Sequence, residues 1–167
     1  ILFLIGGIAS YYINSASIKF LYFIIIPLLV LYPVIFKKIP LLGNIVVSFL
    51  LSLVFMFTEG VLMGSYSLLL IPSYLIFGLS LIREIIKDMH DYDGDKACGI
   101  QTLCVVLGVV NTIFFTRILI IVFMILLLLP YQLGYYDKNY LISAIILIEI
   151  PLLAVVCLLN KYSNKKT

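Results

Sequence analysis

Charged side chains are scarce in this sequence, and their scarcity excludes most classes of soluble protein. Only 11% of the 167 residues are Asp, Glu, Lys or Arg, whereas 64% are hydrophobic. A soluble domain carries about 25% charged residues, so the composition predicts an integral membrane protein with the lipid bilayer as its surroundings. The net charge of +3 predicts no nucleic-acid partner, because the charge is confined to the edges of the predicted membrane spans.

Cysteine is also rare, and a recognisable leader segment is lacking. The three cysteines are odd in number and follow no ligand or pairing pattern, which argues against a disulfide framework or a zinc site. The chain begins at Ile1 in the middle of an apolar run, without the pattern of a signal peptide. We therefore expect a fragment of a longer protein.

The apolar runs predict an all-α fold, because a membrane-spanning helix needs about 20 mostly apolar residues. We expect a multi-span transmembrane helical bundle that forms one domain over residues 1–167, with kinks at Pro27 and Pro33. No internal repeat or soluble linker interrupts it. The predicted spans are a stub at 1–13 and five complete spans at 20–36, 45–58, 61–82, 112–130 and 140–159.

The basic residues predict the orientation of these spans. If five spans alternate, Lys19 and Lys138 lie on one side of the membrane and the other basic residues lie on or near the opposite side. Cytoplasmic loops are enriched in Lys and Arg. The richer side, which includes the stretch 83–103, is therefore predicted to face the cytoplasm.

The stretch 83–103, REIIKDMHDYDGDKACGIQTL, holds five of the eight acidic residues. If it is a regular helix, Glu84, Asp88, Asp91 and Asp95 fall within an arc of about 60°, with Asp93 on the opposite side. Like charges at i and i+4 repel, so this arrangement favours a cation among them. Mg2+ is the economical choice, because it takes oxygen ligands, typically one or two carboxylates together with substrate phosphates.

Two other interpretations of the stretch compete with a magnesium and phosphate site. Runs of charge are usually solvated helix ends, but the one-sided clustering makes that interpretation weaker. The segment DYDGD suggests a calcium loop, yet an EF-hand requires Gly at position 6 and Glu at position 12. Counted from Asp91, those positions hold Lys96 and Thr102.

The same residues resemble the second aspartate-rich motif of the UbiA family of intramembrane prenyltransferases. Asp91 and Asp95 match its DxxxD signature, and Gly99, Thr102 and Leu103 match the residues that follow. The preceding run R-E-x-x-K-D is most similar to the archaeal lipid branch of the family. A second, less specific match is the segment 32–44, whose landmarks are Tyr32, Lys37, Gly43 and Asn44.

This resemblance implies a Mg2+-dependent transfer of a prenyl group from an allylic diphosphate. Asp91 and Asp95 are the expected catalytic and metal-binding residues, with Asp88 as a third metal ligand. For the lipid branch, the expected donor is geranylgeranyl diphosphate and the expected acceptor is geranylgeranylglyceryl phosphate. The residues expected to bind these substrates are Tyr32, Lys37, Arg83, Glu84, Lys87 and Lys96. The alternative for Glu84 is a structural ion pair with Arg83.

The chain departs from the family pattern in one respect. The family's first aspartate-rich motif, NDxxDxxxD, is absent from this sequence. Family members have nine spans, so we expect the helices that carry the first motif to precede Ile1 and a further helix to follow the chain. Half of the metal site is then missing, and this fragment alone is expected to be inactive.

Other functions remain open at this point. An aromatic quinone precursor is the alternative acceptor within the family. A divalent-cation transporter is the alternative outside enzymes, but it should carry polar residues along a pore at mid-membrane, where only Glu149 qualifies. The DGxxAR signature of CDP-alcohol phosphotransferases is not found. Glu149 is expected to be paired or protonated, and His90 to lie on the surface at a helix edge.

Overall fold

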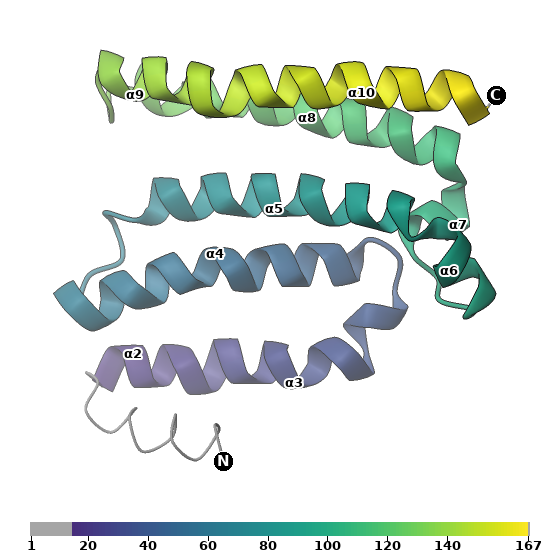
Figure 1. The fold of residues 1–167 in the computed structure, drawn as a ribbon. Coiled ribbons are helices and arrows are strands. Elements are labelled where there is room, and N and C mark those ends of the chain that lie inside the picture. The colour runs from purple at the N-terminus through teal and green to yellow at the C-terminus, as the bar shows by residue number, and fades with distance from the viewer. Residues whose placement is uncertain (1–14, 167) are drawn as a thin grey trace. The chain divides into compact units, whose positions relative to one another are not determined.

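The computed structural model describes residues 15–166, and their regular structure is helical throughout, without a strand (Figure 1). The predicted all-α fold is confirmed. The chain divides into two compact units, Ile1–Leu81 and Ile82–Thr167. The single domain stays a prediction, although helix α5 (Leu70–His90) runs through the division without a break.

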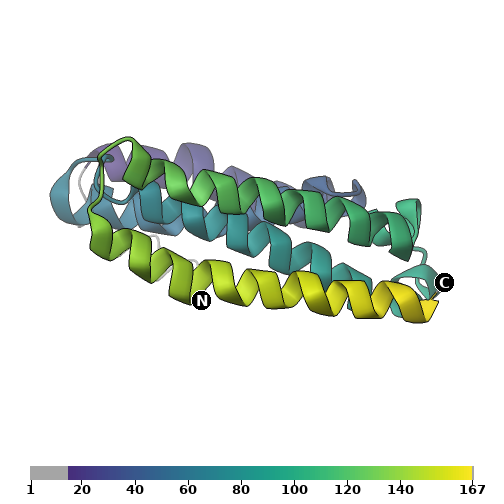
Figure 2. The same ribbon diagram turned by 90° about the horizontal axis from the view of Figure 1, so that it is seen from above.

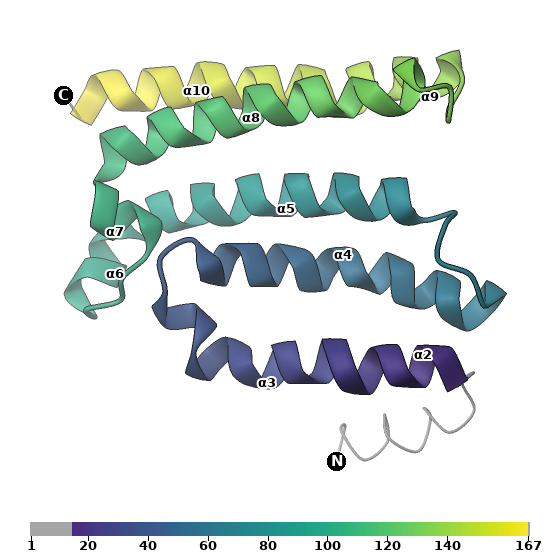
Figure 3. The same cartoon turned by 180° about the vertical axis from the view of Figure 1, so that it is seen from behind.

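The first unit is built on a helical hairpin. Its first arm joins α2 (Ser15–Phe20), the π-helical turn η1 (Leu21–Ile25) and α3 (Ile26–Val34). A short 3-10 turn, η2 (Phe36–Lys38), leads to the second arm, α4 (Leu42–Met63). The two arms lie side by side in Figures 1 and 3.

The hairpin turn depends on a small residue at position 43. A Cβ atom added to Gly43 would lie 3.2 Å from the carbonyl oxygen of Phe36 and 3.5 Å from the Cα of Lys37. The first is closer than most Cβ contacts in proteins, so a larger residue would push η2 and the start of α4 apart. Gly43, one of the landmarks of the segment 32–44, therefore has a packing role in the turn.

A buried carboxylate near the end of α4 organises the loop that follows. Glu59 is only 2% exposed, and its side chain accepts four hydrogen bonds from the loop. Its Oε1 accepts from Ser65 Oγ and from the backbone N–H groups of Ser67 and Leu68, each at 2.8 Å. Its Oε2 accepts from the backbone N–H of Leu69 at 2.7 Å. Glu59 thus fixes the chain immediately before α5 begins.

The neighbouring Gly60 makes room for an aromatic side chain of the same loop. A Cβ atom at Gly60 would collide with the ring of Tyr66. That ring also packs on Phe20 of α2, with centroids 5.7 Å apart, and its hydroxyl lies 3.4 Å from Ser17 Oγ. The loop is consequently held against both arms of the hairpin.

The second unit contains the end of α5, two short helices and a second hairpin. The short helices are α6 (Tyr92–Ala97) and α7 (Leu103–Leu107). One arm of the hairpin is α8 (Val109–Gln132), and the other joins α9 (Lys138–Ala144), the π-helical turn η3 (Ile145–Glu149) and α10 (Ile150–Lys166). Figure 2 shows the two arms running side by side.

Both hairpins have one arm with a π-helical turn ahead of a proline. Turn η1 ends two residues before Pro27, and η3 ends two residues before Pro151. A proline lacks the N–H that an α-helix requires at that position, and a π turn is a common way to absorb the mismatch. The kink predicted at Pro27 takes this form, whereas α3 ends one residue after Pro33.

Four helical segments in residues 15–166 are long and apolar enough to cross a membrane: 17–34, 42–63, 109–132 and 138–160. The stub predicted at 1–13 lies outside the described residues. The prediction of a complete span at 61–82 is wrong, because residues 61–63 finish α4, residues 64–69 form the loop around Glu59, and α5 begins at Leu70. Helix α5 is long enough, but the charges in its last turns set it apart from the four.

The four hydrogen bonds to Glu59 predict that its removal loosens the loop. Glu59→Leu should lower the free energy of unfolding by about 3 kcal/mol, since part-buried donors lose their acceptor. Glu59→Gln, which retains one acceptor oxygen, should have a smaller effect. Thermal unfolding in detergent and hydrogen exchange of the amides at 67–69 would measure both. Thr58→Ala is the matched control, because its exposed hydroxyl bonds only within α4; equal results for Glu59→Leu and this control would contradict the prediction.

Gly60→Ala should destabilise the first unit by about 1–3 kcal/mol, because the added methyl group must displace the ring of Tyr66. The test is a double-mutant cycle on the free energy of unfolding. In a Tyr66→Ala background the same substitution should be nearly neutral. Gly94→Ala provides the control, since a Cβ there meets no atom within 4 Å. A full loss of stability that persists without Tyr66 would refute the steric explanation.

Candidate functional site

The acidic stretch folds as two helices rather than one. Helix α5 ends at His90 and α6 begins at Tyr92, with Asp91 between them at φ −86° and ψ 5°, outside the ordinary helical region. The uninterrupted helix assumed from the sequence is therefore wrong at this residue. The backbone nevertheless keeps helical hydrogen bonds across it, from Asp91 N to Lys87 O and from Asp95 N to Asp91 O, both at 2.9 Å.

The charges of α5 begin only 13 residues into the helix, at Arg83. At 1.5 Å per residue, the apolar part that precedes them is about 20 Å long, whereas the hydrocarbon core of a bilayer is about 30 Å thick. If α5 enters the membrane from its first residue, Arg83 and Glu84 lie within its depth. Ionisable groups at such a depth line a polar cavity or pair with one another.

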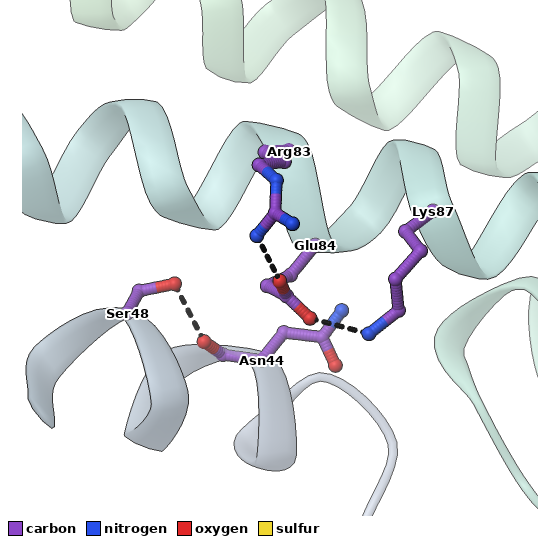
Figure 4. A network of polar contacts seen from close by, with 5 residues as sticks. All are labelled: Asn44, Ser48, Arg83, Glu84 and Lys87. Atoms are coloured by element: carbon purple, nitrogen blue, oxygen red, sulfur yellow. Dashed lines mark hydrogen bonds and ion pairs between the residues drawn. The ribbon is translucent and has the colours of Figure 1, made fainter. Parts of the chain in front are cut away.

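Pairing is observed directly at this point of α5. Arg83 Nη1 donates to Glu84 Oε1 at 2.9 Å, and Lys87 Nζ donates to Glu84 Oε2 at 2.6 Å (Figure 4). The carboxylate is largely enclosed, with its side chain 11% exposed, while the Arg83 and Lys87 side chains are 71% and 52% exposed. The ion pair with Arg83 that the sequence left open is thus present, and Lys87 completes a cluster of net charge +1.

The remaining carboxylates divide by exposure. Asp88 is buried, Asp95 is partly exposed, and Asp91 and Asp93 are exposed. Asp91 and Asp95 stay at i and i+4 on the retained helical turn, and neither forms an ion pair with any residue in 15–166. Two neighbouring carboxylates without a cation between them suit a metal ion with oxygen ligands.

These residues alone do not complete a metal site. Within the described part of the chain, no three His, Cys, Asp or Glu side chains are grouped to hold a metal ion. The metal ligands predicted from the sequence, Asp88, Asp91 and Asp95, therefore stay a prediction. The chemistry of Asp91 and Asp95 fits one part of a shared ligand set.

The residues after the carboxylates form a tight turn that explains their types. Gly99 has φ +70°, a left-handed conformation that residues with a side chain rarely adopt. The N–H of Ile100 then donates back to the carbonyl of Asp95 at 2.9 Å. Leu103 is buried, and Thr102 Oγ1 is buried without a hydrogen-bond partner in residues 15–166. The turn therefore braces α6 against α7.

Lys96 contacts an aromatic ring of its own helix. Its Nζ lies 5.6 Å from the centroid of the Tyr92 ring and 3.5 Å from the Tyr92 hydroxyl. Both side chains are on α6, one turn apart. The expected role of Lys96 in substrate binding is neither supported nor contradicted by this contact.

Tyr32 and Lys37 belong to the first unit. Tyr32 is partly exposed on α3, and Lys37 is exposed in η2. The acidic stretch belongs to the second unit, and the predicted meeting of these two side chains with it stays a prediction.

Two ionisable residues had no assigned role. His90 is the exposed last residue of α5, as expected for a helix edge. Glu149 is the last residue of η3 and the midpoint of the span 138–160. It is partly exposed, and no residue in the described range forms a hydrogen bond or an ion pair with it.

Sequence reasoning missed the role of Glu59, which fell between the predicted spans 45–58 and 61–82. Its signal was present: a single acidic residue in a long apolar run, followed by Gly60 and by a short segment containing Ser65 and Ser67. A lone carboxylate beside several potential donors suggests an anchored loop rather than a binding site.

Comparison with known proteins decides the family. The model of the UbiA prenyltransferase family matches residues 1–167. The chain belongs to the UbiA prenyltransferase family. The family match includes both the acidic stretch and the segment 32–44, the two segments that resemble UbiA motifs.

Three curated relatives that match the chain share one name. A digeranylgeranylglyceryl phosphate synthase from Sulfurisphaera tokodaii is 34% identical, over 95% of this chain and 56% of the relative. One from Sulfolobus acidocaldarius is 32% identical, over 96% of this chain and 57% of the relative. One from Methanococcus aeolicus is 34% identical, over 82% and 48% respectively. The chain spans about half the length of these relatives. No solved structure matches.

Proposed function

We propose that the protein to which this chain belongs transfers a geranylgeranyl group from its diphosphate to geranylgeranylglyceryl phosphate in the synthesis of archaeal ether lipids. The relatives that match over most of the chain bear the name of this synthase. The observation that carries the proposal is the arrangement on α5 and α6. The carboxylates of Asp91 and Asp95, at i and i+4, follow the cluster in which Glu84 binds two cations. A reaction between two phosphorylated lipids needs both kinds of group.

Asp91 and Asp95 are proposed to hold Mg2+ as part of a ligand set, with Asp88 as a further ligand. When bound, Mg2+ acts as a Lewis acid that stabilises the negative charge of a diphosphate leaving group. The protein itself places these carboxylates at i and i+4 and keeps the turn that follows them rigid. Gly99 and the hydrogen bond from Ile100 to Asp95 provide that rigidity.

Basic and polar side chains are proposed to bind phosphate oxygens around the carboxylates. Arg83 and Lys87 are candidates on the same helix, and Lys96 is a candidate on α6. From the first unit, Lys37 would contribute a cation and Tyr32 a hydroxyl. Charge-assisted hydrogen bonds of this kind are shorter and stronger than neutral ones. The apolar helices would exclude water from the reactive prenyl group.

The acidic end of α5 is proposed to face the cytoplasm. If the spans alternate in direction as the sequence predicts, most basic residues lie on the same side of the membrane as this helix end. Basic residues favour the cytoplasmic side. A divalent-cation transporter is less well supported, because most acidic residues gather at one helix end and, among residues 15–166, only Glu149 lies at mid-span.

The two aspartates at i and i+4 should matter more than the exposed Asp93. In the full-length protein, Asp91→Ala and Asp95→Ala should each lower Mg2+-dependent kcat/KM by about 100-fold or more, since a metal ligand supports several kcal/mol of charge stabilisation. Asp93→Ala is the matched control and should retain most activity. A magnesium titration with each variant would measure the effect, and equal losses for all three would show that the break at Asp91 redirects Asp93 to the metal.

The acceptor can be decided by competition between two substrates. Purified full-length protein, geranylgeranyl diphosphate and Mg2+ are offered geranylgeranylglyceryl phosphate or 4-hydroxybenzoate in parallel. We expect transfer to the glycerol hydroxyl alone, with product detected by mass spectrometry. Prenylation of the aromatic compound with the glycerol phosphate left untouched would overturn the lipid assignment and leave the family assignment standing.

A further inference from the structure

Helix α8 carries a single charged side chain, Arg117, in a segment that is long and apolar enough to cross a membrane. Arg117 follows the first residue of the helix, Val109, by eight positions, or about 12 Å along the axis. Charged side chains at such a position are costly unless they pair with another group or extend to the membrane edge. The surroundings of Arg117 show which of these applies.

The guanidinium of Arg117 lies at the membrane edge. Its Nη2 donates to the backbone carbonyl of Leu159 on α10 at 3.3 Å, and Leu159 is one residue from the end of the apolar span 138–160. The two arms of this hairpin run antiparallel, so the end of that span is level with the start of α8. Side chains lean toward the start of their helix, and Arg commonly places its charge in this way. Phospholipid phosphates occupy the same level.

The second unit itself leaves most of this guanidinium without a partner. A guanidinium has five N–H donors, and the bond to Leu159 is the one hydrogen bond that Arg117 forms with residues 15–166. Its length is beyond the common range for N–H to oxygen. Nε is buried without an acceptor, and Arg117 forms no ion pair in this part of the chain. Its positive charge therefore calls for an anion from elsewhere.

An exposed apolar stripe on α8 runs from this charge toward the middle of the membrane. We call it the outer stripe; its residues are 46–64% exposed and comprise Phe114, Ile118, Ile121 and Ile125. Their spacing of i, i+4, i+7 and i+11 puts them on one side of the helix, and Arg117 borders that side, about 40° from Ile121 around the axis. The stripe is about 16 Å long, close to half of the 30 Å hydrocarbon core. One lipid chain of one leaflet has this length.

We propose that Arg117 and the outer stripe of α8 bind a phospholipid of the surrounding membrane. The phosphate of the lipid accepts hydrogen bonds from the Nη groups of Arg117, and one of its chains lies along the stripe. A phosphodiester carries one negative charge, which offsets the one positive charge of the guanidinium. The planar fork of Arg also matches phosphate oxygens better than a point charge does. The inference uses no residue of the acidic stretch and does not rest on the proposed function.

Binding can be measured with purified full-length protein in detergent and two lipids that differ only in the headgroup phosphate. Dioleoylphosphatidylglycerol should bind saturably in native mass spectrometry, whereas dioleoylglycerol should not. Arg117→Met should raise the Kd for the phospholipid at least about tenfold, as expected for loss of a charged hydrogen bond. Arg117→Lys, which keeps the charge without the fork, should give an intermediate value.

Lys138→Met is the matched control, because it removes one positive charge from an exposed side chain at the other end of the same hairpin. It should change the Kd less than about twofold, a small effect on this scale. An equal rise in both Met variants would show general attraction between charges and would overturn the proposal. Absence of saturable phospholipid binding by the wild type would also overturn it, and the partner of Arg117 would then be another protein segment.

A second measurement separates a lipid site from a link between helices, since the bond to Leu159 also joins α8 to α10. Phosphatidylglycerol should raise the thermal unfolding midpoint of the wild type, and this increase should be absent in Arg117→Met. If the variant instead unfolds at a lower temperature by the same amount with and without the lipid, Arg117 has a structural role only and the proposal is wrong.

The source of the phosphate is decided by competition and by labelling. Inorganic phosphate and glycerol 1-phosphate should fail to displace phosphatidylglycerol even in large excess, because they cannot contact the outer stripe. A phosphatidylglycerol with a diazirine in one acyl chain should label residues 114–125 on illumination, and Arg117→Met should reduce this label. Displacement by the soluble phosphates, or labelling that is independent of Arg117, would refute a phospholipid at this site.

Discussion

Placing a carboxylate among apolar side chains costs free energy, and this cost constrains the structure around Glu59 and around Glu84. An isolated ionised group in such surroundings is strongly unfavourable unless it is paired or fully hydrogen-bonded. Glu59 meets the requirement with four donors from one loop, and Glu84 meets it with two cations. In both cases the partners come from residues close in sequence, so each carboxylate is satisfied within its own unit.

The two solutions have different consequences. Around Glu59, the four donors are a loop hydroxyl and three backbone N–H groups, and the carboxylate is only 2% exposed. Around Glu84, the donors belong to long side chains that remain more than half exposed. The first arrangement fixes where α5 begins. The second places a cluster of net charge +1 near its other end, just before Asp91 and Asp95.

The sequence predicted the fold class and the location of the acidic site better than its local geometry. Long apolar runs identify helices because no other regular element satisfies the backbone within one segment in a membrane. The sequence did not predict the loop at 64–69 that follows α4. Glu59 looks like the end of a helix until its hydrogen-bond partners at 65–69 are known. The break at Asp91 was also missed, since periodicity cannot register a change of backbone angle at one residue. The pairing of Glu84 with Lys87 follows from spacing, but its burial does not.

The π-helical turn η3 serves as a register correction for the second hairpin. In a regular helix, the eight residues from Ala144 to Leu152 would place these two side chains about 80° apart around the axis. Because a π turn takes up one extra residue, the separation becomes that of seven residues, the same as between Leu152 and Leu159. All three side chains are buried, and together they form one straight seam. Deleting a single residue between 145 and 149 would rotate the two halves of this seam apart, so the helix should tolerate substitutions there far better than a change in its length.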